Sequence, residues 1–389
     1  MSKLLNIPRS ELDLRLGKIR EGMSGLGSDA LLVSANANIY YLTGRVFAGY
    51  ILITDRECRF FVRRPLFLDG ENIDYIRKPE EIPSILGDRR FSNVAIEMNR
   101  ESYSGCLRLM KLFPEAEFRN ADTAIDSARE VKTPAQIELI RESGIMQTEV
   151  YRKIPDLYRP GMTDTALQIA IETESRLHGC LGQFRISGNS MELFMANILA
   201  GDNADNPTPY DFAMGGAGAD PSLPVGADGT VIRPGMSVMV DCNGNYTGYM
   251  TDMTRTFALG ELAPEAVRAH ECSIRICREV AAAGISGAEA SALYRLAAGI
   301  AEEEGLGKYF MGHRQKAGFV GHGVGIEINE SPVIAPKSRH ILQAGNVIAL
   351  EPKFVIPGTG AVGIENTYLV TENGGMVSLT TAPEEIIRL

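Results

Sequence analysis

Two segments of this chain each place an acidic residue on both arms of a predicted β-hairpin. In the first, residues 237–241 form a predicted strand that ends in Asp241. A loop rich in Asn and Gly follows, and the return strand contains Asp252. If the hairpin is centred between Tyr246 and Thr247, the two acids are directly opposite each other. Their Cβ atoms are then only about 4.5–5.5 Å apart. This pairing strongly restricts how the chain can fold, because the charges need compensation.

The second hairpin repeats the pattern. Residues 347–351 end in Glu351, residues 357–360 (Pro-Gly-Thr-Gly) form a turn, and the return strand carries Glu365. A turn centred on Gly358 places Glu351 opposite Glu365. A single acid on a strand is usually solvated, but two such hairpins with otherwise apolar strands favour a shared purpose for the acids.

The chemistry that suits these acids is metal binding. A carboxylate pair at about 4 Å and an effective dielectric of about 20 costs roughly 4 kcal/mol, so the acids need shared protons or cations. His322, between two glycines, can add an imidazole ligand. Such a set suits a two-metal site that activates water. The predicted metal ligands are Asp241, Asp252, His322, Glu351 and Glu365.

Length and composition narrow the function further. The 389 residues suggest two or three domains, and 44% hydrophobic residues suit large cores. A net charge of −10 argues against nucleic-acid binding. No apolar run is long enough for a membrane span, and the start does not resemble a signal peptide. The six cysteines form no CxxC pair, so we expect reduced thiols and a cytoplasmic location.

The chain is predicted to divide into domains 1–130 and 131–389. In the first, a helix bearing Leu12, Leu16 and Ile19 leads to strands at 29–34 and 50–53, with a turn at 36–38 between them. Near the junction, Thr133 can cap a helix that begins at Pro134. The first half is therefore expected to be α/β, and the second α+β with long antiparallel hairpins.

Two helices of the second half have predicted apolar faces. The first face consists of Ile137, Ile140, Ile145 and Met146, and the second of Ala166, Ile169, Ala170 and Thr173. Residues 264–283 and 286–305 are further helices. Residues 201–229 form a long irregular loop, which is either a binding loop or lid or a surface insertion.

Four segments resemble the metal motifs of the pita-bread metallopeptidase family, in that family's order. They are residues 240–257, 321–327, 350–352 and 363–367. Residues 29–33 and 38–44 are similar to the amino-terminal domain of the prolidase and creatinase branch. The resemblance implies an α+β protein with an α/β creatinase-like amino-terminal domain and a pita-bread catalytic domain. It also implies a homodimer.

The resemblance further implies roles for the matched residues. Asp252 and Glu365 would bridge two divalent ions, Asp241 would chelate one, and His322 with Glu351 would complete the other. Manganese is expected, with cobalt, zinc or iron as alternatives. Activated water would attack the carbonyl of a short peptide, and Glu351 would pass the proton towards the leaving amine.

Three positions depart from the family pattern. Asn329 replaces a histidine, Val225 follows Leu-Pro where a histidine is usual, and Gly363 stands where an arginine is common. Asn329 is predicted to serve catalysis as an amide donor to the oxyanion. His313 is a second candidate for the missing imidazole, or it is a loop histidine.

The leading hypothesis is a metal-dependent Xaa-Pro aminopeptidase or dipeptidase. An alternative, motivated by the departures, uses the same metals for C–N or C–S cleavage of a small amine or zwitterion. A non-catalytic interaction module is a third hypothesis, which the five intact ligands disfavour.

Overall fold

The computed structural model describes residues 2–188, 191–212 and 214–389. The chain divides into two compact units, Met1–Arg129 and Glu130–Leu389, one residue from the predicted boundary. Within the described ranges, no helix is long and apolar enough to cross a bilayer.

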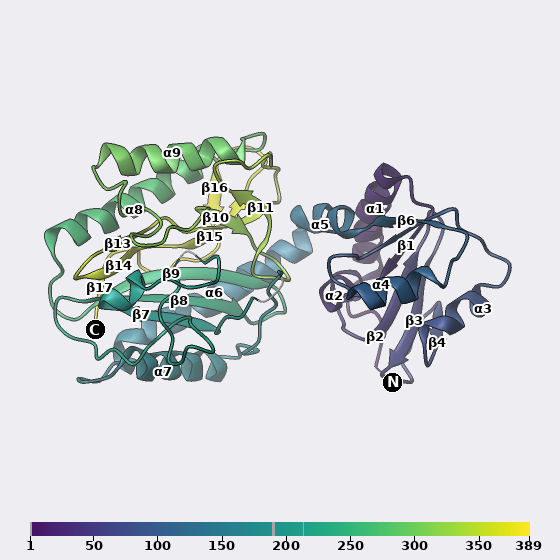
Figure 1. Ribbon diagram of the computed structural model, residues 1–389, viewed down its shortest axis with the longest axis horizontal. Helices are drawn as coiled ribbons and strands as arrows, with labels where there is room; N and C mark the ends of the chain where they lie inside the picture. The colour runs from purple at the N-terminus through teal and green to yellow at the C-terminus, as the bar shows by residue number, and fades with distance from the viewer. Residues whose placement is uncertain (1, 189–190, 213) are drawn as a thin grey trace. The chain divides into compact units, whose positions relative to one another are not determined.

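The first unit contains a six-stranded mixed sheet in the order β4-β3-β2-β1-β5-β6 (Figure 1). β1 and β2 are antiparallel, whereas β1, β5 and β6 run parallel. The strands are β1 (Ala30–Val33), β2 (Ala48–Ile53), β3 (Cys58–Arg64), β4 (Ile73–Tyr75), β5 (Asn93–Ile96) and β6 (Glu117–Asn120). The helices are α1 (Arg9–Leu26), α2 (Asn36–Thr43), α3 (Ile82–Leu86), α4 (Tyr103–Met110) and α5 (Asp122–Glu130).

The predicted α/β character of this unit is confirmed, with one local correction. The helix bearing Leu12, Leu16 and Ile19 is α1, and all three side chains are buried. The turn expected at 36–38 is instead the start of helix α2, which ends at Gly44 in the left-handed conformation. Ile39 and Leu42 are buried and lie three residues apart, which is a helical spacing. The expectation of a short turn did not take this spacing into account.

The second unit is α+β, as predicted. Its helices are α6 (Pro134–Leu157), α7 (Asp164–Leu177), α8 (Pro264–Ala283) and α9 (Ala290–Glu303). Its strands are β7 (Ala196–Ala200), β8 (Ser237–Asn245), β9 (Met250–Ala258), β10 (Gly321–Gly323), β11 (Glu330–Ile334), β12 (Val347–Leu350), β13 (Lys353–Ile356), β14 (Gly360–Gly363), β15 (Asn366–Val370), β16 (Met376–Ser378) and β17 (Ile387–Arg388). They form sheets β11-β10-β12-β15-β16, β13-β14 and β17-β9-β8-β7.

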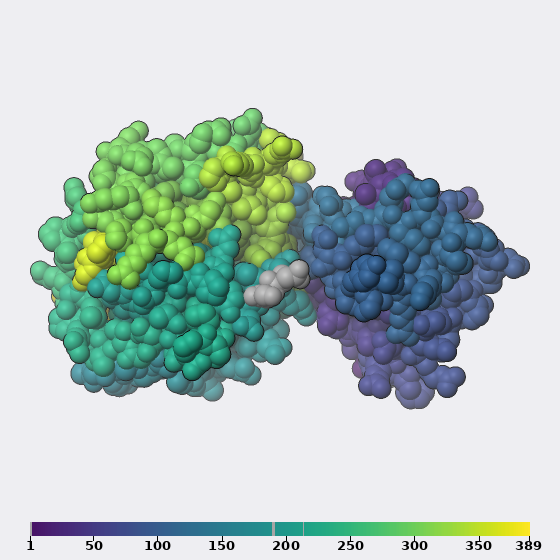
Figure 2. All heavy atoms as spheres, viewed as in Figure 1, coloured from purple at the N-terminus to yellow at the C-terminus, as the bar shows by residue number. Residues whose placement is uncertain are grey.

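Helices cover the strands of this unit on two sides (Figure 1). α6 and α7 pack on β7, β8 and β9, whereas α8 and α9 pack on β11, β13 and β14. Each layer has its own apolar core, around Tyr151 and Ile198 in the first and Ile276 and Phe354 in the second. In Figure 2 the teal surface of this unit comes from the first of these layers and the green to yellow-green surface from the second, whereas the bright yellow patch is the C-terminal end, whose strand β17 pairs with β9 of the first layer. The two hairpins therefore meet where the layers join.

Helix α6 begins as predicted, but up to residue 148 its buried face is largely polar. Thr133 and Gln136 form a capping box, with Pro134 in the first turn. Of the predicted stripe only Ile140 is fully buried, and Ile145 is 54% exposed. Ser143 instead donates to the carbonyl of Tyr249 at 2.8 Å, and Gln147 donates to that of Cys242. The hairpin's carbonyls need donors, so polar side chains occupy this face.

The apolar face predicted for α7 is also wrong, because the buried residues lie next to the predicted ones around the helix. Ile169 is 62% exposed, whereas Leu167 and Ile171 are buried. These two larger side chains pack with Ile198 of β7. Leu167 and Ile171, four residues apart, bury more apolar area than Ala166 and Ala170 of the predicted face would.

Candidate metal centre

The first acidic hairpin consists of β8 and β9, and its register differs from the prediction. Asn243 pairs with Asp252, and Asp241 pairs with Thr254. The loop between Asn245 and Met250 includes Gly248 at φ 88°, so its centre lies one residue later than expected. The direct opposition of Asp241 and Asp252 was therefore wrong. They are diagonal neighbours, and the two-residue side-chain period keeps them on one face.

The second acidic hairpin has the predicted register. Leu350 pairs with Asn366, and Lys353 pairs with Gly363. Both pairings are consistent with Glu351 opposite Glu365, in the short gap between the two ladders. The expected centre at Gly358 therefore holds, and it brings these two carboxyl groups together.

Thr254 joins the two hairpins. Its carbonyl accepts a hydrogen bond from the backbone N–H of Glu365 at 3.1 Å. Its hydroxyl donates to Glu365 Oε2 at 2.6 Å. These contacts are long-range in sequence, and they bring the acids of both hairpins into one cluster.

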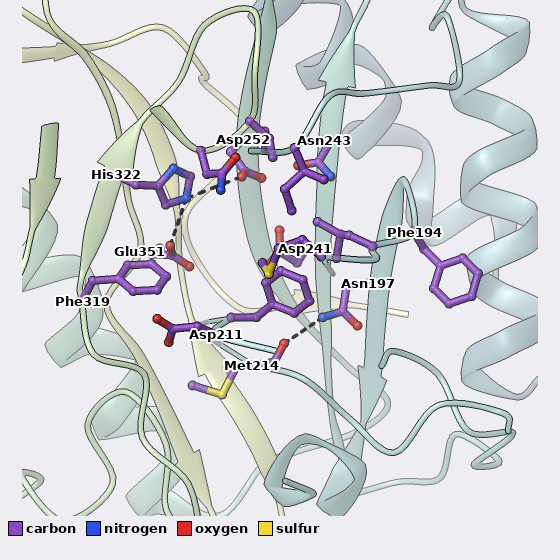
Figure 3. A pocket seen from close by; sticks show the side chains of 16 residues that line it. Phe194, Asn197, Asp211, Met214, Asp241, Asn243, Asp252, Phe319, His322 and Glu351 are labelled. Carbon is purple, nitrogen blue, oxygen red and sulfur yellow. Dashed lines mark hydrogen bonds and ion pairs between the residues drawn. The ribbon is translucent and has the colours of Figure 1, made fainter. Parts of the chain in front are cut away.

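His322 reaches the cluster from β10, a short strand between β11 and β12. Its Nε2 lies 3.3 Å from Glu351 Oε1 and 4.0 Å from Asp252 Oδ2 (Figure 3). Its Nδ1 lies 3.1 Å from the carbonyl oxygen of Gly323, which can only accept. Nδ1 therefore donates, and Nε2 faces the acids. Burial alone would lower the pKa of His322, but Glu351 raises it, and a metal ion bound here would take the place of the Nε2 proton, as in histidines that bind metals.

The flanking glycines allow this position. A Cβ atom on Gly323 would lie 2.2 Å from the carbonyl oxygen of Ser331, and one on Gly321 would lie 2.6 Å from that of Ala349. Both distances are too short for a side chain. Glycine is therefore required for β10 to fit between its neighbours and present His322.

The five residues predicted as ligands gather into two overlapping groups. One contains Asp252, His322 and Glu365, and the other contains Asp241, Glu351 and Glu365. Within each group the candidate ligand atoms lie within 4.8 Å of one another. Among the described residues, Asp252 Oδ1 and Glu365 Oε1 are buried without a hydrogen-bond partner. Oxygen and imidazole donors of this kind fit a divalent cation.

Electrostatics also favour a cation here. Burial, followed by the charges of Glu365 and Asp241, raises the pKa of Asp252 well above its usual value. Burial and the charge of Glu351 raise the pKa of Glu365 to about 8. The cluster is thus costly when it is fully ionised and bare, because buried like charges repel and lack solvation.

Lys353 is the residue of this centre that sequence reasoning missed. Its Nζ lies 2.8 Å from Glu351 Oε2, 2.9 Å from Asp241 Oδ2 and 3.1 Å from Glu365 Oε2, and its side chain is 0% exposed. Burial alone would lower its pKa, but the three carboxylates raise it well above its usual value. The one hint in the sequence is that Lys353 follows Glu351 by two residues, a spacing that places side chains on one side of an extended chain.

Lys353 and His322 also act on Glu351. Burial alone would raise the pKa of Glu351, but these two neighbours outweigh burial and lower the pKa to about 2. Glu351 therefore differs from Glu365 in the same cluster, although both are buried. The difference arises from the position of the two basic side chains.

Four of the five predicted ligands line a pocket in the second unit (Figure 3). Its polar lining includes these four, Asp241, Asp252, His322 and Glu351, together with Asn197, Asp211, Asn243 and Asn329. The apolar lining consists of Ile186, Met191, Leu193, Phe194, Phe212, Met214, Phe319 and Ile328. Asp211, Phe212 and Met214 come from the predicted irregular loop, so part of that loop lines the pocket.

Asn329 also lines the pocket, but its amide has a different partner from the predicted one. Ser187 donates its backbone N–H to Asn329 Oδ1 at 2.7 Å. Asn329 Nδ2 donates to the Ser187 carbonyl at 2.7 Å. Both ends of the amide thus hold the segment that carries Ile186.

The remaining departures lie elsewhere. His313 binds Asp205 at 2.9 Å and is not among the lining residues. Val225 is fully buried and also not among them. Gly363 has φ 139°, and a Cβ there would lie 2.6 Å from the Pro352 carbonyl oxygen. An arginine at position 363 would therefore not fit this backbone, whereas Lys353 on the paired strand supplies a cation.

Comparisons with known proteins agree with this architecture. Residues 138–372 match metallopeptidase family M24, and residues 15–131 match the creatinase/prolidase N-terminal domain. A Xaa-Pro dipeptidase from Pyrococcus horikoshii is 26% identical over 96% of this chain and 98% of its own length. An uncharacterized peptidase from Bacillus subtilis is 27% identical over 97% of this chain and 100% of its own length.

Solved structures share the fold along almost the whole chain. A Xaa-Pro dipeptidase from Bacillus anthracis has a TM-score of 0.82 at 22% identity, covering 97% of this chain and 100% of that one. The prolidase from Pyrococcus horikoshii has a TM-score of 0.78 at 24% identity, covering 96% of this chain and 99% of that one. The fold is thus that of a two-part metallopeptidase, a creatinase-type domain followed by the pita-bread domain, as the motifs predicted. The chain belongs to metallopeptidase family M24.

Proposed function

We propose that this protein is a divalent-metal-dependent hydrolase that cleaves short peptides, as an Xaa-Pro dipeptidase or aminopeptidase. The observation that carries the proposal is the cluster of four carboxylates and His322, of which all but Glu365 line a pocket with many apolar side chains. The names of the relatives, Xaa-Pro dipeptidase among them, support the substrate class.

Asp241, Asp252, His322, Glu351 and Glu365 are the proposed metal ligands. A divalent ion held there would lower the pKa of water and polarise the scissile carbonyl. Glu351 is proposed to move the proton, because its Oε1 faces His322 and its carboxyl group lines the pocket. The apolar wall would receive the substrate's side chain or proline ring and exclude water.

Several finer features remain proposals. Manganese is the proposed metal, since carboxylates and imidazole suit it, with cobalt, zinc or iron as alternatives. The sequence predicts two ions, but Lys353 contacts all three acids of the second group of ligands.

The domain division at 130/131 is supported by the compact units. A homodimer is also proposed, and light scattering would test it. A cytoplasmic location is proposed because the six cysteines are buried free thiols.

The substrate is tested by a panel. With Mn(II) added, the protein should hydrolyse dipeptides with an apolar first residue and a second-position proline, and chelation should abolish that activity. Liberated amino acids are measured, and small amines and zwitterions with C–N or C–S bonds are included. If fully metallated protein cleaves no peptide but cleaves one of these compounds, the alternative chemistry replaces the proposal.

A variant of Asn329 separates two roles for that residue. Asn329→Ala removes two hydrogen bonds to Ser187, each worth about 1 kcal/mol. We expect KM for the best peptide to rise by roughly tenfold or more, because the segment carrying Ile186 loosens, while metal content stays unchanged. A fall in kcat of roughly 10²–10³-fold at constant KM would instead support an oxyanion donor.

A further inference from the structure

Lys353 occupies a position that a cation would otherwise take. Its Nζ contacts Asp241, Glu351 and Glu365 at 2.9, 2.8 and 3.1 Å. These are the three residues of one of the two candidate metal groups. An ammonium with three donors suits three carboxylate oxygens, so it provides the positive charge that these acids need.

A metal ion in this group would compete with the ammonium for the same space. Hard divalent ions sit roughly 2.0–2.6 Å from their oxygen ligands. A metal held by these three residues would therefore lie close to the present Nζ position, where two cations strongly repel. The ammonium and a second metal ion exclude each other here.

Both the backbone and the side chain of Lys353 are held in the interior of the second unit. Its backbone pairs with Gly363 in the β13–β14 ladder, and its carbonyl accepts from Met311 N–H at 2.8 Å. Its side chain is 0% exposed. Moving it from the acids would leave a buried charge without its partners, which is strongly destabilising.

In the other group, which contains Asp252, His322 and Glu365, two carboxylate oxygens make no contact with the ammonium. Asp252 Oδ1 and Glu365 Oε1 have no hydrogen-bond partner within the described part of the chain. His322 Nε2 is directed to the same end of the cluster. This end retains the imidazole and unpaired oxygens that a single ion needs.

We propose that Lys353 replaces the second metal ion, so that the centre holds a single divalent ion at Asp252, His322 and Glu365. The inference rests on the proposed metal centre, and it differs from the dinuclear site that the sequence predicts. It makes the ammonium a permanent part of the centre next to Glu351.

The test is the metal stoichiometry of the full chain. Chelator-treated protein is titrated with Mn(II), and bound metal is measured by elemental analysis after desalting. Wild type should bind a single ion, with the electron paramagnetic resonance spectrum of isolated Mn(II). Lys353→Met preserves the length of the side chain without its charge, and this variant should bind a second ion and show a spin-coupled pair.

Lys132→Met is the matched control. Lys132 is also a buried lysine, 1% exposed and 3.0 Å from Glu330, but it lies outside the cluster. Its variant should bind a single ion, as wild type does.

The outcomes are distinct. Wild type binding two coupled ions would overturn the inference and leave the metal centre standing. Wild type binding none would refute the metal centre itself. A single ion in both wild type and Lys353→Met would show that Lys353 does not exclude the second. If Lys353→Met fails to fold, the wild-type stoichiometry and spectrum alone decide the count.

Discussion

Asp252→Asn is expected to lose most of the bound metal and roughly 10²–10⁴-fold of the peptide hydrolysis. A catalytic metal provides several kcal/mol of transition-state stabilisation, and about 1.4 kcal/mol corresponds to tenfold in rate. Asp252 belongs to the group that contains His322, and its Oδ1 has no partner among the described residues. The amide has the same size but offers a single neutral oxygen in place of a charged ligand.

The same change should leave the metal-free protein at least as stable as wild type. Burial and neighbouring acids raise the pKa of Asp252 in the folded state. The ionised form is therefore destabilising above the unfolded pKa, and a neutral amide removes that penalty. Thermal melting in excess chelator checks this sign.

Asp164→Asn is the matched control, because Asp164 is buried but caps backbone N–H groups away from the cluster. It should retain the metal. If Asp252→Asn bound metal as tightly as wild type, Asp252 would not be a ligand. If it melted far below wild type in chelator, its role would be structural.

Arg255→Ala is expected to lower the free energy of unfolding of the second unit by at least about 4 kcal/mol. Arg255 is 0% exposed. It donates to the carbonyls of Thr254 and Glu365 at 2.7 Å each, and to Asn366 Oδ1 at 2.7 Å. Each stranded buried acceptor costs about 1–3 kcal/mol, and the cavity adds to the loss.

Arg255 also links the cluster to the end of the chain. Its guanidinium donates to the carbonyls of Ala382 and Pro383. Denaturant unfolding followed by circular dichroism measures the loss. Arg255→Lys should recover little of it, because an ammonium cannot reproduce the planar set of donors.

The control is Arg268→Ala on the exposed face of α8, where surface changes usually stay within about 0.5 kcal/mol. Equal stabilities of the Arg255→Ala and Arg268→Ala variants would show that the buried network contributes nothing.

We also expect Arg255→Ala to weaken metal binding by roughly 10–100-fold, because groups that orient the ligands have effects of that size.

Local chemistry made much of the fold predictable. Helix α6 begins at Pro134 after its Thr133 cap because capping depends on residues within one turn. The Glu351 and Glu365 register followed from a turn centred on Gly358, at φ 79°. The β8–β9 hairpin contains glycines at both 244 and 248, of which only Gly248 has a positive φ and lies beside the turn centre. One residue of error there shifted the partner of Asp241 by two positions along the opposite strand.

The faces of α6 were less predictable for a physical reason. A periodic pattern identifies which residues are apolar, but not which partners a helix will meet. Ser143 and Gln147 are buried because the carbonyls of Tyr249 and Cys242 lie across from them. That requirement arises only when segments about a hundred residues apart are packed together.

The amino-acid sequence by itself determined the hairpins, the acids that share a face and the metal motifs, because strand period and turn residues act over short distances. Only the tertiary structure decided that Lys353 lies among three of the acids and that Asn329 holds Ser187. Those contacts depend on how separate segments pack, and neither residue type indicates its partner on its own. A lysine two residues after an acid is commonly solvated, and here the surrounding strands bury its charge against the carboxylates.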